Sequence, residues 1–242
     1  MNADNEIIKF DDDTYLIIPA TNSSTSELEL NHIRSWATSN NLQLNHTKSK
    51  ELVFFAQRGR LHTAQHPPVC QGIEQVESLT ALGVTINNRF SVTEHVTKVL
   101  SSCSGLLYAL RILRTHGMNA TSLYDVFRAT IVAKLSYCSP AWSGFCSSAD
   151  ISRLDAFIKR CKRYGYCPDN FLKISELFTD ADDQLFSRVL YTPAHVLKPL
   201  LPNHKQHDYN LRDRSHNFEL INKNAHLNDR HFIVRQLYKD SY

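Results

Sequence analysis

The chain has 242 residues, of which 42% are apolar, and its formal net charge is +3 at pH 7. This length and composition are those of one large or two small globular domains. The longest apolar run near the start, residues 15–18, is too short to cross a bilayer, and no basic segment precedes a long apolar one. We therefore expect a soluble intracellular protein, nuclear or cytoplasmic, that is neither secreted nor bound to a membrane.

The six cysteines are scattered along the chain, and no two form a C-x-x-C pair. This spacing argues against a zinc ribbon, a redox dithiol and a dense disulfide framework. We predict that the cysteines are reduced and pack in the interior.

Charge is distributed unevenly along the sequence. Residues 1–30 contain seven acidic residues and one lysine, whereas residues 98–163 contain ten basic residues and three acidic ones. Such a basic segment favours a polyanionic partner, although a solvated basic helix face is the commoner explanation for any single helix.

The first part of the chain combines strand and helix patterns. Two β-prone runs, residues 6–10 and 14–19, flank three consecutive aspartates and predict a tight hairpin with the acids at its tip. Apolar residues at helical spacing predict a helix over residues 26–39, with Ser26 and Glu29 as a capping box. Residues 51–56 and 79–86 are further predicted strands, the second with a bulge at Gly83.

The three adjacent carboxylates at residues 11–13 need an explanation, because neighbouring like charges repel by about 1 kcal/mol in water. Asp is a common turn residue, and water alone can solvate such a turn. A divalent cation is the alternative, because it holds the acids ionised and uses their oxygens as ligands. An EF-hand is not predicted, since its loop needs Gly at the sixth position and Glu at the twelfth, where this chain has Leu16 and Asn22.

Long helices follow from about residue 90. Seven apolar residues alternate by four and three and predict one buried helix that stops at Gly117: Val92, Val96, Val99, Cys103, Leu106, Leu110 and Leu113. A second helix is predicted from Ser122 to Pro140, and a third over residues 149–164. The third helix turns apolar residues inward and is predicted to turn five cations outward: Arg153, Lys159, Arg160, Lys162 and Arg163.

The remaining pattern is weaker. Short helices are predicted over residues 173–178 and 182–191, followed by a proline-rich loop and a histidine-rich tail. His204 and His207 have ligand-like spacing, but nothing nearby completes a four-ligand zinc site. The fold class is therefore α+β, with predicted domains at residues 1–88, 89–167 and 168–242.

Several motifs, in this order, resemble the reverse transcriptase of non-LTR retrotransposons of the LINE type, similar to the Jockey and CR1 elements. "KFDDDTYLI" at residues 9–17 resembles the palm motif K-[FY]-A-D-D-T, with Asp11 where the family has Ala. Residues 36–54 resemble the next palm motif, including Asn45 and Lys48, and "LTALGVTINNRFSVTEHV" is similar to the hairpin that leads into the thumb. Residues 123–144 and 153–163 resemble the helical thumb and connection, and residues 232–242 the end of the reading frame.

The resemblance implies roles for specific residues. Asp12 and Asp13 would help to hold two Mg²⁺ ions for RNA-directed DNA polymerase chemistry with deoxynucleoside triphosphates. Lys48 would lie near the triphosphate. The cations of residues 153–163 would bind the backbone of an RNA or DNA template–primer without sequence specificity.

The family's fingers, its first metal-binding Asp and its nucleotide-selecting motif have no counterpart in this sequence. We therefore expect a truncated polymerase fragment in which Asp12 and Asp13 are vestigial, with weak or absent Mg²⁺ binding and no independent activity. Residual non-specific nucleic-acid binding is the expected property, and Asp11 is consistent with relaxed constraint. The missing strands also predict an unpaired edge and an exposed apolar face in the first 85 residues.

Two alternatives remain. The apolar stripe of residues 92–113 could serve a helical protein-interaction module. The region around residues 82–96 is also similar to the small N-terminal segment of AlkB-like tRNA-modifying proteins, without their catalytic domain. Dioxygenase chemistry itself is excluded, because no histidine is followed two positions later by Asp.

Overall fold

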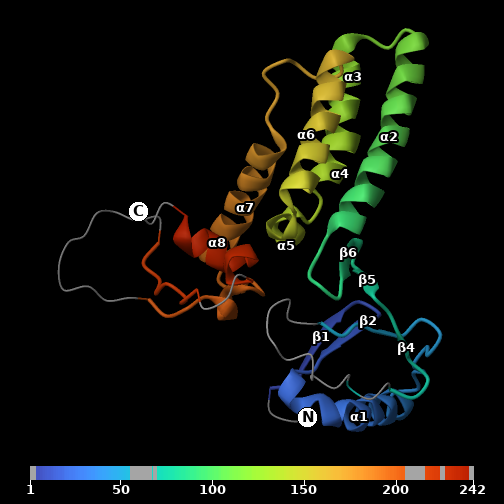
Figure 1. Ribbon diagram of the computed structural model, residues 1–242, viewed down its shortest axis with the longest axis vertical. Helices are drawn as coiled ribbons and strands as arrows, with labels where there is room; N and C mark the ends of the chain where they lie inside the picture. Colours follow the sequence, from blue (N-terminus) through green and yellow to red (C-terminus); the bar gives the residue numbers. More distant parts are fainter. Residues whose placement is uncertain (1–3, 55–66, 68–69, 205–215, 224–226, 240–242) are drawn as a thin grey trace, which may run out of the picture. The chain divides into compact units, whose positions relative to one another are not determined.

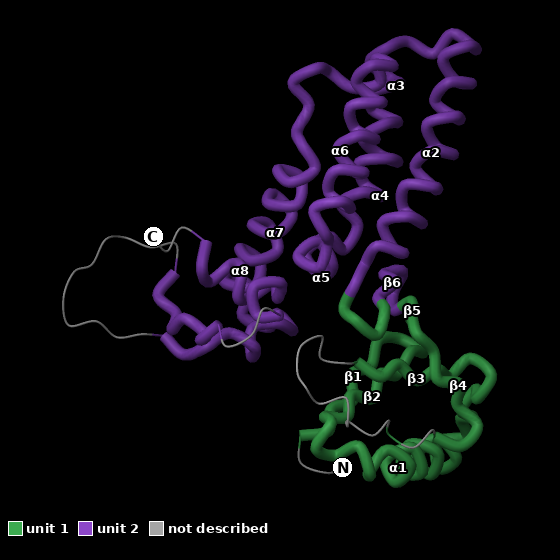
Figure 2. Tube along the Cα trace, viewed as in Figure 1, with its two compact units in different colours: residues 1–80, 87–90 green, residues 81–86, 91–242 purple. Residues whose placement is uncertain are grey.

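The structure is a computed structural model, and it describes residues 4–54, 67, 70–204, 216–223 and 227–239. It has small two-stranded sheets and a larger helical part, which confirms the predicted α+β class. The chain forms two compact units (Figure 2). Unit 1 comprises residues 1–80 and 87–90, and unit 2 comprises residues 81–86 and 91–242. The main boundary between the units lies near residue 90, and residues 168–242 fall within unit 2.

Unit 1 begins with the predicted hairpin. Strands β1 (Glu6–Phe10) and β2 (Asp13–Ile17) pair antiparallel across a two-residue turn, with Phe10 opposite Asp13. A 3₁₀ turn, η1 (Ala20–Thr25), leads into α1 (Ser26–Ser39), whose bounds match the prediction. Of the strand predicted over 51–56, the structure retains only β3 (Lys50–Glu51), which pairs parallel with β4 (Glu74–Gln75); residues 55 and 56 lie outside the described residues.

The predicted capping box of α1 is wrong. The N-cap residue is Thr25, and no side chain caps the helix there. Glu29 is instead buried and accepts a hydrogen bond from Asn5 Nδ2 at 3.1 Å, while its other oxygen lies 3.2 Å from His32 Nδ1. A buried carboxylate is costly in free energy unless it is hydrogen-bonded, and Asn5 and His32 provide these partners.

The predicted exposed apolar face of unit 1 is confirmed. The strand register places Ile8, Phe10 and Ile17 on one face of the hairpin, and these side chains are 49%, 60% and 48% exposed. The opposite face meets α1, where Lys9 Nζ lies 3.6 Å from the centroid of the Trp36 ring. Buried apolar side chains are so scarce in the described part of unit 1 that it has no large core of its own.

Residues 78–87 form a hairpin rather than the single bulged strand predicted from their pattern. Strand β5 (Ser78–Ala81) pairs with β6 (Val84–Asn87). The two turn residues, Leu82 and Gly83, have φ values of 47° and 85°, as a tight hairpin turn requires. The Tyr137 hydroxyl donates a hydrogen bond to the Leu82 carbonyl at 3.1 Å and so braces this turn.

Unit 2 is built mainly from helices (Figure 1). The long helix α2 (Thr93–Thr115) is followed by a returning segment that contains α3 (Ala120–Phe127), a π-helical turn η2 (Arg128–Val132), α4 (Ala133–Ser136), α5 (Ser139–Trp142) and the 3₁₀ turn η3 (Ser143–Phe145). Then come α6 (Ser148–Arg163) and α7 (Ile174–Tyr191). The segment predicted from Ser122 thus begins at Ala120 with Asn119 as its cap, and the two short helices predicted over 173–191 are one helix.

The core of unit 2 lies between these helices and contains the predicted stripe of α2. Val96, Val99 and Cys103 are buried in it, while Leu106 and Leu113 are partly buried. Within the described part of the chain, α2 is the one helix long and apolar enough to span a membrane, but a core helix of a soluble protein has the same length and composition. One face of α2 packs in the core, and 28% of its apolar window is buried.

Helices α2 and α6 both end in a glycine motif. Gly117 follows α2 with φ of 85°, and the Met118 amide donates to the Leu113 carbonyl at 3.1 Å. Gly165 follows α6 with φ of 68°, and the Tyr166 amide donates to the Cys161 carbonyl at 3.1 Å. These are the bonds of a Schellman motif, which satisfies carbonyl groups that the helix leaves unpaired.

The last part of unit 2 is held against α7. After the 3₁₀ turns η4 (Lys198–Leu200) and η5 (Asn228–Arg230), the short helix α8 (Phe232–Tyr238) packs on α7. Phe186, Ile233 and Leu237 form a second buried apolar cluster there. Of the two histidines considered for zinc, His204 stacks on Phe218, and His207 lies outside the described residues.

Candidate functional site

The three aspartates lie at the tip of the β1–β2 hairpin and are exposed. Asp11 and Asp12 form the turn, and Asp13 is the first residue of β2. Asp11 has φ of 51°, in the left-handed region that Asp adopts more readily than other residues with a side chain. The turn geometry therefore gives a structural reason for Asp rather than Ala at this position. The Asp13 carboxylate accepts a hydrogen bond from the Tyr15 hydroxyl at 3.3 Å.

As a metal site, this turn offers part of a ligand shell. Asp12 and Asp13 supply two exposed carboxylates from one hairpin, and Mg²⁺ binds through one or two carboxylates when water and substrate phosphate fill its other positions. Over the described ranges, no group of three or more His, Cys, Asp or Glu side chains is placed to hold a metal ion.

Lys48, predicted to lie near a nucleotide, belongs to a separate turn of unit 1. The Asn45 side chain organises that turn, because its Oδ1 accepts from the Lys48 amide at 3.2 Å and the Thr47 hydroxyl at 2.7 Å. The Lys48 side chain is exposed, and no hydrogen bond or ion pair joins it to the acidic turn in the described part of the chain. Over the described ranges, the structure thus bonds Lys48 to Asn45 and not to Asp12 or Asp13.

The five cations predicted to face outward from α6 fall into two groups. Lys159 and Arg163 are exposed, and the Arg163 guanidinium lies 5.6 Å from the centroid of the Tyr164 ring. Arg160 and Lys162 are only half-exposed, which corrects the prediction for these two residues. Lys162 donates to two backbone carbonyls of the loop that follows α6, those of Asp169 and Phe171, at 2.8 and 2.6 Å.

Arginines of α6 also tie this helix to α2. Arg153 Nη2 donates to Thr97 Oγ1 at 2.8 Å, and Arg160 Nη2 donates to Ser104 Oγ at 3.0 Å. Both steps are seven residues long, so α2 and α6 run side by side in the same direction, as Figure 1 shows. Arg153 remains 41% exposed as a side chain, although it also pairs with Asp150 at 3.4 Å.

Two of the three acidic residues of segment 98–163 accept hydrogen bonds from other parts of the fold. Asp150 is buried; burial opposes its ionisation, but hydrogen bonds from Ser147 and Thr93 outweigh that effect and lower its pKa. Asp155 accepts from the Ile174 amide at the start of α7 at 3.1 Å. Asp125 is the remaining acid of the segment, and it is exposed. Eight of the ten cations of the segment are also exposed: Lys98, Arg111, Arg114, Arg128, Lys134, Arg153, Lys159 and Arg163.

Sequence reasoning did not single out Arg111 and Arg114. Arg114 Nη2 donates to the Tyr164 carbonyl at 2.7 Å, and its guanidinium lies 3.9 Å from the centroid of the Tyr166 ring. A sequence pattern that could have identified Arg111 is the seven-residue spacing of Thr97, Ser104 and Arg111. This spacing places the three residues on one stripe of α2.

Three of the five cysteines of unit 2 confirm the prediction of buried packing residues: Cys103, Cys161 and Cys167. Cys146 is only partly buried, and Cys138 is exposed, so the prediction is wrong for Cys138. Burial raises the pKa of Cys161 to about 12 and that of Cys167 to about 11. Thiols held protonated at neutral pH are poor nucleophiles. Each of the six cysteines is free of disulfides.

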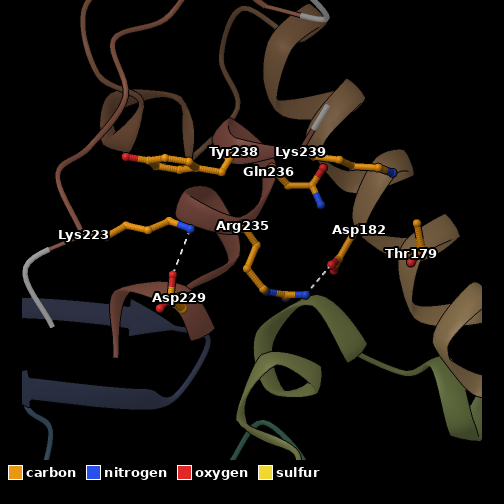
Figure 3. A pocket seen from close by; sticks show the side chains of 8 residues that line it. All are labelled: Thr179, Asp182, Lys223, Asp229, Arg235, Gln236, Tyr238 and Lys239. Carbon is orange, nitrogen blue, oxygen red and sulfur yellow. Dashed lines mark hydrogen bonds and ion pairs between the residues drawn. The ribbon is translucent and has the colours of Figure 1, made fainter. Parts of the chain in front are cut away.

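A cavity of about 380 Å³ lies between α7 and the C-terminal segment (Figure 3). Its charges are arranged in pairs. Arg235 Nη1 lies 2.6 Å from Asp182 Oδ2, and Lys223 Nζ lies 2.9 Å from Asp229 Oδ1. The Arg235–Asp182 pair joins α8 to α7, which indicates a structural role for it.

Comparisons with protein-family models, with curated proteins and with solved structures found no match for this chain.

Proposed function

We propose that this chain derives from the reverse transcriptase of a non-LTR retrotransposon, and that its helical unit binds nucleic acid through the phosphate backbone without sequence specificity. The order of the motifs along the sequence supports the origin. The acidic hairpin and the second hairpin before a helical unit are the elements that this resemblance implies.

The observation that carries the binding proposal is the separation of charge between interior and surface. Asp150 and Asp155 are engaged by Ser147, Thr93 and the start of α7, so they contribute little negative charge to the surface. Lysine and arginine side chains remain exposed on several helices of the same unit. Within residues 98–163, Asp125 is the one exposed acid alongside eight exposed cations. Exposed cations with few neighbouring carboxylates attract a polyanion and release its condensed counterions.

Burial of the α2 stripe supports this proposal over the alternative of a helical interaction module. The apolar stripe of α2 packs inside unit 2, where Val92, Val96 and Cys103 are fully buried. Side chains that pack in the core of their own unit offer less surface to a partner helix.

Binding of labelled RNA and DNA to the full chain, followed by fluorescence anisotropy across a salt series, tests the proposal. Affinity is expected to fall steeply as salt rises. The double variant Lys159→Gln and Arg163→Gln should reduce the slope of log K against log salt by about 1 to 2. The matched control is Arg188→Gln, which removes an exposed cation from α7 and should change the slope less.

The proposal would be refuted by an affinity that does not change with salt concentration, or by a double variant with the same slope of log K against log salt as the wild type. A primer-extension assay with Mg²⁺ or Mn²⁺ addresses the chemistry separately. We expect no incorporation of deoxynucleotides, and incorporation that disappears in Asp13→Asn would show that the acidic turn is catalytic.

A further inference from the structure

Beyond the hydrogen bond between Ser104 and Arg160, the surface between α2 and α6 carries two tyrosines and two arginines. Tyr108 and Arg111 come from α2, and Arg163 and Tyr164 from the end of α6; we call these four residues the α2–α6 seam. On α2, Tyr108 and Arg111 follow Ser104 by four and seven residues, so they share its stripe. On α6, Tyr164 follows Arg160 by four residues.

The two tyrosines lie at the same height along the parallel helices, because each follows one partner of the Ser104–Arg160 hydrogen bond by four residues. Ser104 and Arg160 are hydrogen-bonded at 3.0 Å, and each tyrosine lies four residues, roughly 6 Å, further along its parallel helix. Tyr108 is 64% exposed and Tyr164 is 46% exposed. The two rings therefore present apolar surface to solvent from adjacent helices.

The end of the seam is held rigidly. The Tyr164 carbonyl accepts from Arg114 at 2.7 Å, and the Tyr164 ring meets the edge of Tyr166 with centroids 6.4 Å apart. Gly165 closes the helix, so the carbonyls of the last turn are hydrogen-bonded. Lys162 donates to two backbone carbonyls, and Arg114, although exposed, donates to the Tyr164 carbonyl. Arg111 and Arg163 are two further exposed cations near the rings.

We propose that the α2–α6 seam binds single-stranded nucleic acid, with unpaired bases stacked on Tyr108 and Tyr164 and phosphates contacted by Arg111 and Arg163. This inference rests on the proposed function and adds the class of ligand. An aromatic ring stacks on the face of any unpaired base, whereas the bases of a duplex are already stacked on one another. Exposed rings between cations therefore select a single strand over a duplex.

The test compares three ligands with the full chain: oligothymidine, an abasic strand with the same number of phosphates, and a DNA duplex. Tyr108→Ala and Tyr164→Ala should each weaken oligothymidine binding by about 5- to 150-fold. Binding of the abasic strand and the duplex should change by less than about 2-fold in these variants, because their phosphate contacts remain. Tyr108→Phe and Tyr164→Phe should retain binding, since they keep the ring.

The matched control is Tyr191→Ala, which removes a 79% exposed tyrosine from the end of α7. Circular dichroism should show the same melting temperature for all alanine variants, because the rings are exposed. Oligothymidine binding that survives both substitutions, or wild-type affinity equal for oligothymidine and the abasic strand, would overturn this inference while leaving the proposed function intact. A wild-type chain that binds none of the three ligands would overturn both.

Discussion

The ion pair between Arg235 and Asp182 gives a sharp prediction about the stability of unit 2. Arg235 lies on α8 and Asp182 on α7, and their side chains are 24% and 5% exposed. Arg235 Nη2 also reaches the Pro140 carbonyl at 3.3 Å and Ser143 Oγ at 3.4 Å, so one side chain joins three segments. Arg235→Leu keeps most of the aliphatic bulk and removes every donor.

The expected cost comes from the aspartate that remains. Leaving one partner of a buried pair uncompensated typically destabilises a protein by about 3–5 kcal/mol. Lys239→Leu is the matched control, because it breaks the neighbouring pair with Asp183, whose side chains are 33% and 47% exposed. An exposed pair of that kind contributes about 0.2–1 kcal/mol.

The loss in Arg235→Leu should depend on pH. Burial raises the pKa of Asp182 even with Arg235 present, and removal of the guanidinium raises it further. A carboxyl whose pKa is higher in the folded state than in the unfolded state destabilises the fold increasingly as pH rises above the unfolded value of 3.8. The variant should therefore be closest to wild type in acid and furthest from it at neutral pH.

Urea unfolding followed by tryptophan fluorescence measures both variants. Trp142 is buried beside the Arg235 contacts, and its Nε1 donates to the Tyr137 carbonyl at 2.9 Å. A Trp36→Phe background removes the signal of unit 1. If Arg235→Leu costs no more free energy of unfolding than Lys239→Leu, or if its loss is the same at acid and neutral pH, the buried-pair reasoning fails.

Three further predictions concern unit 2. Gly83→Ala should destabilise unit 2 by about 1–2 kcal/mol, because the φ value of Gly83 is 85°. Gly105→Ala should stabilise unit 2 by up to about 1 kcal/mol, because Gly105 lies inside α2 with open space around it. Thermal melts compare the two variants. Burial, with Lys98 nearby, lowers the pKa of His95, so wild-type stability should fall as pH drops below 6.5, and His95→Gln should flatten that decline in urea titrations. Arg160→Gln should lower the free energy of unfolding by about 1–2 kcal/mol, because it removes the hydrogen bond to Ser104 and the contact with the Phe157 ring. Lys159→Gln should change the free energy of unfolding by less than about 0.5 kcal/mol and mainly weaken nucleic-acid binding. Equal losses of stability would contradict the assignment of Arg160 to helix packing.

Periodic apolar patterns determined much of the fold. The helix over 26–39 and the buried stripe of α2 follow from spacing alone, since a helix that buries one face must repeat apolar residues every three or four positions. The acidic hairpin follows from two β-prone runs around a turn. These features are local, so the sequence by itself was sufficient.

Tertiary packing decided the rest, because long side chains find partners that lie far away in the chain. Arg160 and Lys159 are adjacent in the sequence and carry the same charge. Arg160 donates a hydrogen bond to Ser104 on α2, whereas Lys159 is exposed to solvent. Likewise, Glu29 has the spacing of a capping residue, but its side chain is buried and accepts a hydrogen bond from Asn5. A pattern shows which face of a helix is apolar, but only the neighbouring helix decides which of its charges stay free for a ligand.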